Sequence, residues 1–113
     1  PGAEFFYVPA DSVFETARAR RAVAFDIPGA PFSHVGERCS FDAFVEMFGL
    51  DDAGVAALQP IIRGADTDRH ALAPEAAGLH ALSLGLSATF PDDVRLLEQG
   101  MILYDALYAW ATR

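Results

Sequence analysis

The sequence predicts a single α+β domain that is predominantly helical, with about five helices and a small two-stranded sheet near the N-terminus. Apolar residues recur at helical spacing over most of residues 40–111. Prolines, glycines and capping residues divide that stretch into segments of helix length. Two short runs rich in aromatic and β-branched residues precede it, and a chain of 113 residues has the length of one domain with one core.

The N-terminal part of the sequence predicts a strand, a helix and a second strand. Residues 4–8 (EFFYV) and 22–27 (AVAFDI) are the two expected strands, and a proline follows each of them. Between them, Asp11 or Ser12 can cap a helix that runs to about Arg20. This order favours parallel pairing of the strands with a right-handed crossover, although the helix is short for that connection.

Four further helices are expected after a long loop. Ser40 is a good N-cap for the first of them, and Gly49 suits the position just past its end. In the next helix, Pro60 is expected to kink or split the helix near Leu58, and Gly64 to end it in the left-handed conformation. The expected helices cover about 41–48, 52–63, 74–89 and 91–111, with a loop over 64–73. Two glycines in the helix over 74–89 are expected to mark close helix crossings, Gly78 and Gly85.

The charge of the chain narrows the classes of partner. Sixteen acidic and eight basic residues give a formal net charge of −8, and every basic residue is an arginine. An acidic surface repels phosphate backbones, so we expect no direct nucleic-acid binding by this segment. Any anion site needs a local arginine cluster, for which Arg38, Arg63 and Arg69 are the candidates.

Composition also bears on location and assembly. One cysteine excludes an internal disulfide and fits a reducing, cytoplasmic compartment. The chain begins with Pro1 rather than Met, which leaves export open. No apolar run is long enough for a membrane span, so no membrane insertion is expected. A hydrophobic content of 52% suggests that a second copy of the chain or a missing N-terminal segment covers part of the surface.

The loop between residues 27 and 40 carries the first candidate metal ligands. It is longer than the usual connection of roughly 4–6 residues, and long ordered loops are often functional. His34 and Cys39 can together ligate a transition metal, although the spacing His-x4-Cys matches no standard zinc motif. Asp42 is a further carboxylate nearby. The alternatives are that Cys39 is a small buried hydrophobe, which is somewhat favoured, and that His34 bonds a loop carbonyl.

Two acidic residues at loop–helix junctions complete the candidate site. Asp66 and Glu75, together with His34, would form a His/Asp/Glu site for a divalent cation if all three face one pocket. The alternatives are an Asx turn at Asp66 and a surface acid at the helix start for Glu75.

A candidate anion or substrate site consists of Arg63, Arg38 and Asp26. Its alternative is a set of ordinary salt bridges. His70 and His80 lack evident partners in the sequence and are interpreted as surface residues.

Several motifs together resemble the chromate-resistance protein ChrB family, in its C-terminal ChrB-type domain. They are FDIPGA with HVGERCSF, RGADT, LAPEAAGL and YDALYAW, and they span nearly the whole chain. The resemblance implies a single domain over residues 1–113 that lacks the basic, cysteine-containing helix with which the family's domain usually begins. It also places His34, Cys39, Asp66 and Glu75 at motif positions.

The expected function follows from the residues and the resemblance together. It is a chromate-resistance accessory or regulatory domain, part of a bacterial stress response, that binds or senses a metal species. The cofactor would be a divalent transition metal whose identity stays open. The alternatives are a small metal-dependent redox or hydrolytic enzyme that uses the same pocket, and a structural or dimerisation module without a ligand.

Overall fold

The computed structural model describes residues 2–25, 27–30, 33, 36 and 38–113, and within them the chain is predominantly helical. The elements in chain order are η1 (Ala10–Ser12), α1 (Val13–Arg20), α2 (Ser40–Phe48), α3 (Ala53–Asp66), η2 (His70–Leu72), α4 (Ala76–Thr89) and α5 (Asp93–Ala111). The expectation of about five helices is therefore confirmed.

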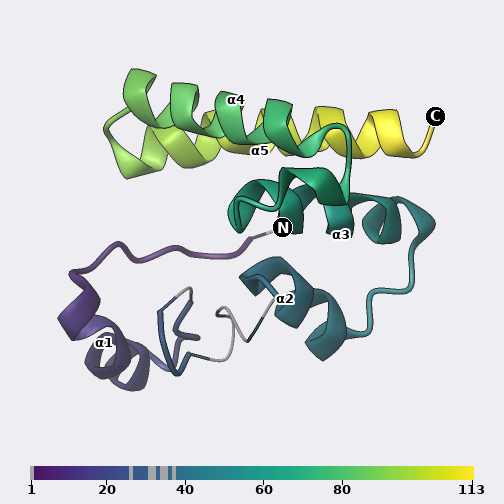
Figure 1. The fold of residues 1–113 in the computed structure, drawn as a ribbon. Coiled ribbons are helices and arrows are strands. Elements are labelled where there is room, and N and C mark those ends of the chain that lie inside the picture. The colour runs from purple at the N-terminus through teal and green to yellow at the C-terminus, as the bar shows by residue number, and fades with distance from the viewer. Residues whose placement is uncertain (1, 26, 31–32, 34–35, 37) are drawn as a thin grey trace.

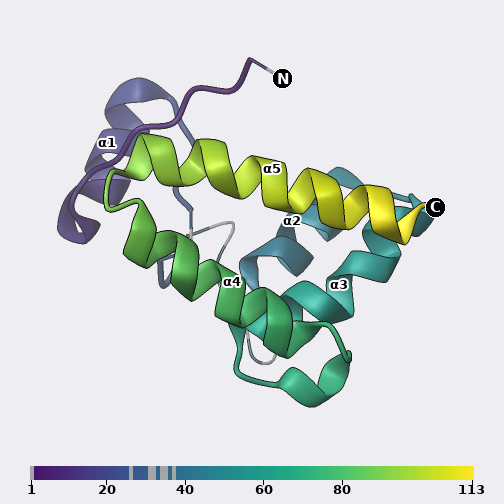
Figure 2. The ribbon, with the colours of Figure 1, turned by 90° about the horizontal axis from the view of Figure 1, so that it is seen from above.

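Helix α3 lies at the centre of the arrangement. It packs against α2 on one side and against α4 and α5 on the other. Helices α4 and α5 form a hairpin whose arms diverge from a short turn, and α3 crosses beneath their open ends (Figures 1 and 2). The segment that contains α1 lies away from this assembly (Figure 1). The C-terminal helices therefore provide the framework on which functional side chains can be held.

The expected two-stranded sheet is wrong, because none of the described residues belongs to a strand. Aromatic and β-branched residues favour a strand only where a partner strand and a core receive them. Here the side chains of Phe5 and Phe6 are 61% and 44% exposed.

The hydrophobic core is small and is built mainly around α3. Its buried members are Cys39, Leu58, Ile61, Ile62, Ala65, Ala73 and Leu79. Four partly buried residues pack against this cluster, namely Phe41, Leu103, Leu107 and Ala111. The periodic apolar positions of α3 thus face inward, as a helix with one apolar face requires.

Local capping explains several helix boundaries. Asp52 caps α3, one residue later than the Asp51 cap implied by the expected start, and its Oδ1 accepts a 2.9 Å hydrogen bond from the Val55 N–H. Gly49 ends α2 with a φ of 56°, as expected. The N-cap of α2 is Cys39 rather than Ser40, which is the first helical residue.

The expected split at Pro60 and the glycine assignments in the helices need correction, while a kink at Pro60 stays a prediction. Helix α3 is one element that includes Pro60, and it also includes Gly64 instead of ending there. A Cβ at Gly64 would lie 2.8 Å from the Ala76 Cβ, so this glycine permits the close approach of α4. Gly78 and Gly85 have open space around them, so the expectation that they mark helix crossings is wrong.

Among the described residues, no helix is both long and apolar enough to span a bilayer.

Candidate metal site

Asp42, on α2, is a fully buried carboxylate held by donors from α3 and from Cys39, the N-cap of α2. The Arg63 guanidinium donates from Nε and from a terminal nitrogen to the two carboxylate oxygens, each at 2.7 Å. The Gln59 amide donates to Oδ1 at 3.1 Å, and the Cys39 backbone N–H donates to Oδ2 at 3.0 Å. These contacts fasten α2 to α3 and occupy both oxygens of Asp42.

The pKa of the Asp42 carboxyl reflects two opposing effects. Burial by itself raises this pKa, because the charged form loses hydration. The hydrogen bonds from Arg63, the Cys39 N–H, Gln59 and the Cys39 thiol together outweigh burial and lower the pKa from 3.8 to about 2. Asp42 is therefore ionised at neutral pH and serves as the internal partner of Arg63.

Cys39 lies in the core and not at an accessible site. Its side chain is 0% exposed, and its Sγ donates to Asp42 Oδ2 at 3.4 Å. Burial and the neighbouring Asp42 charge raise the pKa of the thiol. Because the thiolate is the form that binds metals, this environment disfavours ligation by Cys39.

The two arginines of the candidate anion site are engaged within the protein. Arg63 is paired with Asp42, whereas Arg38 forms an ion pair with Glu46 and donates to the Asp42 backbone carbonyl at 3.3 Å. An external oxyanion would have to compete with these acceptors. The anion-binding role of the two arginines stays a prediction.

The remaining residues predicted from the sequence form no metal-ligand cluster within the part of the chain that the structure describes. His34 and Asp26 lie outside the described residues. Asp66 is the last residue of α3 and is exposed, and Glu75 is the part-exposed residue that precedes α4. Their role as metal ligands stays a prediction.

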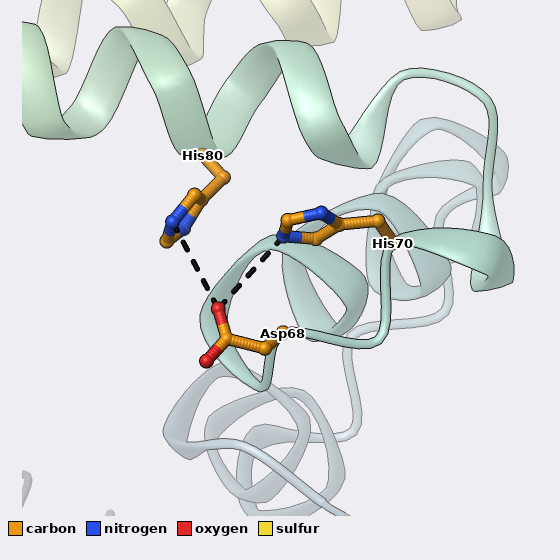
Figure 3. A group of neighbouring side chains, drawn as sticks. All are labelled: Asp68, His70 and His80. Atoms are coloured by element: carbon orange, nitrogen blue, oxygen red, sulfur yellow. Dashed lines mark ion pairs between the residues drawn. The ribbon is translucent and has the colours of Figure 1, made fainter.

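The structure brings together three other residues, Asp68, His70 and His80 (Figure 3). Asp68 lies in the turn after α3, His70 begins η2, and His80 lies on α4. Asp68 Oδ1 is 3.9 Å from His70 Nε2 and 3.8 Å from His80 Nε2. One potential ligand atom from each residue lies within 4.8 Å of the other two.

The orientation of His80 is set by a backbone contact. Its Nδ1 lies 3.0 Å from the carbonyl oxygen of Ala65. A carbonyl oxygen only accepts hydrogen bonds, so in the neutral ring the proton is on Nδ1 and the lone pair is on Nε2. Histidine ligands are commonly oriented by such a second hydrogen bond, and here it directs the basic nitrogen toward Asp68.

His70 presents a ring nitrogen that lacks a hydrogen bond. Its Nε2 is shielded from solvent and makes no hydrogen bond with any described residue. The two imidazole rings lie 5.0 Å apart between centroids, so a group placed beside Asp68 can reach both. An unsatisfied buried polar atom is rare in native proteins and asks for a partner such as a water or an ion.

The interpretation of His70 and His80 as surface residues is therefore corrected. Their side chains are only 38% and 33% exposed, and both face Asp68. The spacing Asp-x-His in the polar connection between α3 and α4 was the available signal. The third member lies ten residues further along, on the next helix, and only the packing of α4 on α3 brings it close.

Comparison with known proteins places the chain in a family. The family described as "ChrB, C-terminal domain" matches residues 1–111. This chain belongs to that family. It is also 39% identical over 88 residues to Protein ChrB of Cupriavidus metallidurans (strain ATCC 43123 / DSM 2839 / NBRC 102507 / CH34), an alignment that covers 77% of this chain and 27% of that protein. The matched part thus spans about a quarter of the relative's length. No solved structure matches.

Proposed function

We propose that this ChrB-type domain acts as an accessory or regulatory domain in chromate resistance and that it binds or senses a divalent transition metal. Membership in the ChrB family supports the role in chromate resistance. The observation that carries the metal-binding function is the convergence of Asp68, His70 and His80. Two imidazoles and a carboxylate are a donor set suited to zinc, iron, nickel or copper.

The electrostatics of the cluster favour a cation. Asp68 contributes a negative charge, and the basic nitrogen of each neutral imidazole can face the same point. Leaving His70 Nε2 unsatisfied would cost about 1–3 kcal/mol, and a bound metal ion removes that cost. The chain's net charge of −8 also raises the local concentration of cations.

The position of the cluster suits a sensor. None of the three residues belongs to the hydrophobic core cluster, which is built mainly around α3. The domain can therefore fold without the metal, unlike a zinc finger, whose folding depends on it. Occupancy can then follow the metal concentration, and binding links the end of α3, η2 and α4 directly.

An interaction module is the second candidate function. Large apolar side chains on the α4–α5 hairpin are well exposed, including Leu84 at 59% and Ile102 at 63%. Exposed apolar surface of this kind often marks a protein interface. Sedimentation of the chain over a range of concentrations distinguishes a self-associating module from a monomer.

Elemental analysis with matched variants tests the metal-binding proposal. The purified chain is loaded with metal, dialysed and compared with His70→Ala/His80→Ala and with Asp66→Asn/Glu75→Gln. The second variant removes the carboxylates of the site predicted from sequence and serves as the control. We expect the wild type and the control to retain one metal ion per chain, and the double-histidine variant to retain none.

The other outcomes contradict parts of the proposal. Loss of metal only in Asp66→Asn/Glu75→Gln would move the site to the residues predicted from sequence. Absence of bound metal from every variant, with all of them folded by circular dichroism, would refute metal binding and favour the interaction module.

A further inference from the structure

We infer that the Asp68–His70–His80 site selects a four-coordinate metal ion of the zinc class and leaves its fourth position to an exchangeable ligand, either water or a small anion. This inference rests on the proposed metal-binding function and specifies the coordination geometry and the ligand class of that site.

The separations of the ligand atoms favour tetrahedral coordination. With metal–ligand bonds of about 2.0–2.1 Å, neighbouring ligands lie about 3.4 Å apart in a tetrahedral site and about 3 Å apart in an octahedral one. The observed separations from Asp68 Oδ1 are 3.9 Å to His70 Nε2 and 3.8 Å to His80 Nε2. For these two pairs, tetrahedral coordination needs the ligand atoms to approach by about 0.5 Å, whereas octahedral coordination needs about twice that. The third pair, between the two imidazoles, lies within 4.8 Å.

Asp68 can move toward the other two ligands more easily than the histidines can move toward it. The Asp68 side chain is 82% exposed and can change rotamer, whereas the His80 ring is held by the Ala65 carbonyl and the two histidines are partly buried. Asp68 therefore supplies the easiest movement toward the two imidazoles, and His80 is already oriented by its backbone contact. A ligand that is oriented before binding loses little conformational entropy when the metal binds.

The cluster supplies three protein ligands, and the part of the chain that the structure describes adds no fourth histidine, cysteine or acid to it. Structural zinc sites have four protein ligands, whereas sites that bind or activate exogenous ligands have three and an open position. Because Asp68 is exposed, solvent reaches the carboxylate side of the site.

The charge of the loaded site determines which ligands suit the open position. A divalent ion with two neutral imidazoles and one carboxylate carries a net charge of about +1, so a small anion can displace the bound water. In a chain with a net charge of −8, such a loaded site is a local positive centre. The metal would thus create an anion-binding position on an otherwise acidic protein.

Titration with Co²⁺ tests the coordination geometry, because four-coordinate Co²⁺ has intense visible bands and six-coordinate Co²⁺ has weak ones. We expect intense bands that saturate at one Co²⁺ per chain. Zn²⁺ should displace the Co²⁺, whereas excess Mg²⁺ or Mn²⁺ should not. A weak, octahedral spectrum, or equal displacement by Mn²⁺, would overturn the tetrahedral assignment.

Addition of azide to the Co²⁺-loaded chain tests the open position. A saturable shift of the visible bands is expected, and an unchanged spectrum at high azide concentration would overturn the exchangeable fourth ligand. If neither Co²⁺ nor Zn²⁺ binds, the proposed function itself fails, and this outcome is distinct from a bound metal with the wrong spectrum.

Asp68→Asn provides a variant that should preserve the fold. Asp68 is exposed and has a φ of 56°, a conformation that asparagine tolerates well. We expect its Co²⁺ affinity to fall by at least the roughly 10–100-fold that loss of a supporting partner costs, with an unchanged circular dichroism spectrum. Asp66→Asn should bind Co²⁺ like the wild type, and a loss of affinity in Asp66→Asn but not in Asp68→Asn would overturn the assignment of ligands.

Discussion

Replacement of Asp42 by asparagine should destabilise the domain strongly, because this carboxylate is the buried link between α2 and α3. Its side chain is 0% exposed and accepts two 2.7 Å hydrogen bonds from Arg63. Asparagine has the same shape, but it is neutral and presents an NH2 group where one of the two oxygens accepts hydrogen bonds. The substitution therefore removes the charge with little change in volume.

The magnitude follows from the pKa of Asp42. Lowering of that pKa from 3.8 to about 2 means that ionisation stabilises the fold by about 2 kcal/mol at neutral pH. The misplaced NH2 group adds roughly 1 kcal/mol, the lower end of the cost of an unsatisfied buried donor. We therefore expect Asp42→Asn to lower the free energy of unfolding by about 3 kcal/mol and the Tm by about 12 °C.

Urea unfolding, followed by circular dichroism between pH 7 and pH 2, measures this effect. The folded-state pKa of Asp42 lies below the unfolded value, so its stabilisation is complete well above pH 4 and is lost as the pH falls through about 2. The stability difference between the wild type and Asp42→Asn should therefore narrow toward pH 2.

Glu46→Gln is the matched control, because Glu46 forms an exposed ion pair with Arg38. Exposed pairs contribute about 0–1 kcal/mol, so this variant should be nearly as stable as the wild type. An Asp42→Asn penalty below about 0.5 kcal/mol, or one that stays constant between pH 7 and pH 2, would refute the reasoning.

Three further predictions concern the site, the helix packing and the thiol. Zn²⁺ at 100 times the wild-type Kd should stabilise the wild type by about 2.7 kcal/mol in thermal melts. It should stabilise Asp68→Asn by only about 0.4–1.4 kcal/mol, as a 10–100-fold weaker Kd implies, and equal shifts would place the metal elsewhere. Gly64→Ala should destabilise in urea by about 1–3 kcal/mol, because its Cβ would lie 2.8 Å from that of Ala76, whereas Gly78→Ala meets open space and should stabilise by about 0.5–1 kcal/mol. If Gly78→Ala destabilised the domain more than Gly64→Ala, the close contact of α3 with α4 at Gly64 would be contradicted. Cys39 is 0% exposed, and burial raises the pKa of its thiol. A thiol reagent should therefore modify Cys39 only in urea, and rapid modification of the native chain would disprove its burial.

The helices were largely predictable because their signals are local. Gly49 ends α2 with a positive φ, as the sequence indicated. Asp92, which lies just inside the expected range of 91–111, caps α5 through the Val94 N–H. Such features depend on neighbours within one or two turns. The start of α3 differed from the expected range by only one residue, since Asp51 and Asp52 can both act as caps.

The strands and the polar partners were not predictable in the same way. Residues 4–8 have strand-forming composition, but a strand also needs a partner, and none of the described residues supplies one. The sequence did not indicate that Arg63 would bond to Asp42, 21 residues away on another helix. Local sequence does not specify which of several acids a given arginine will meet.

The sequence by itself determined the predominantly helical class, most helix ends and the family, because these depend on periodicity, caps and contiguous motifs. Only the tertiary structure decided which polar side chains meet. Asp68, His70 and His80 belong to a turn, a 3-10 helix and an α-helix, and they converge because α4 packs closely on α3. The small side chain of Gly64 permits that approach. Packing of this kind depends on shape complementarity between distant segments, which the pattern within each segment does not encode.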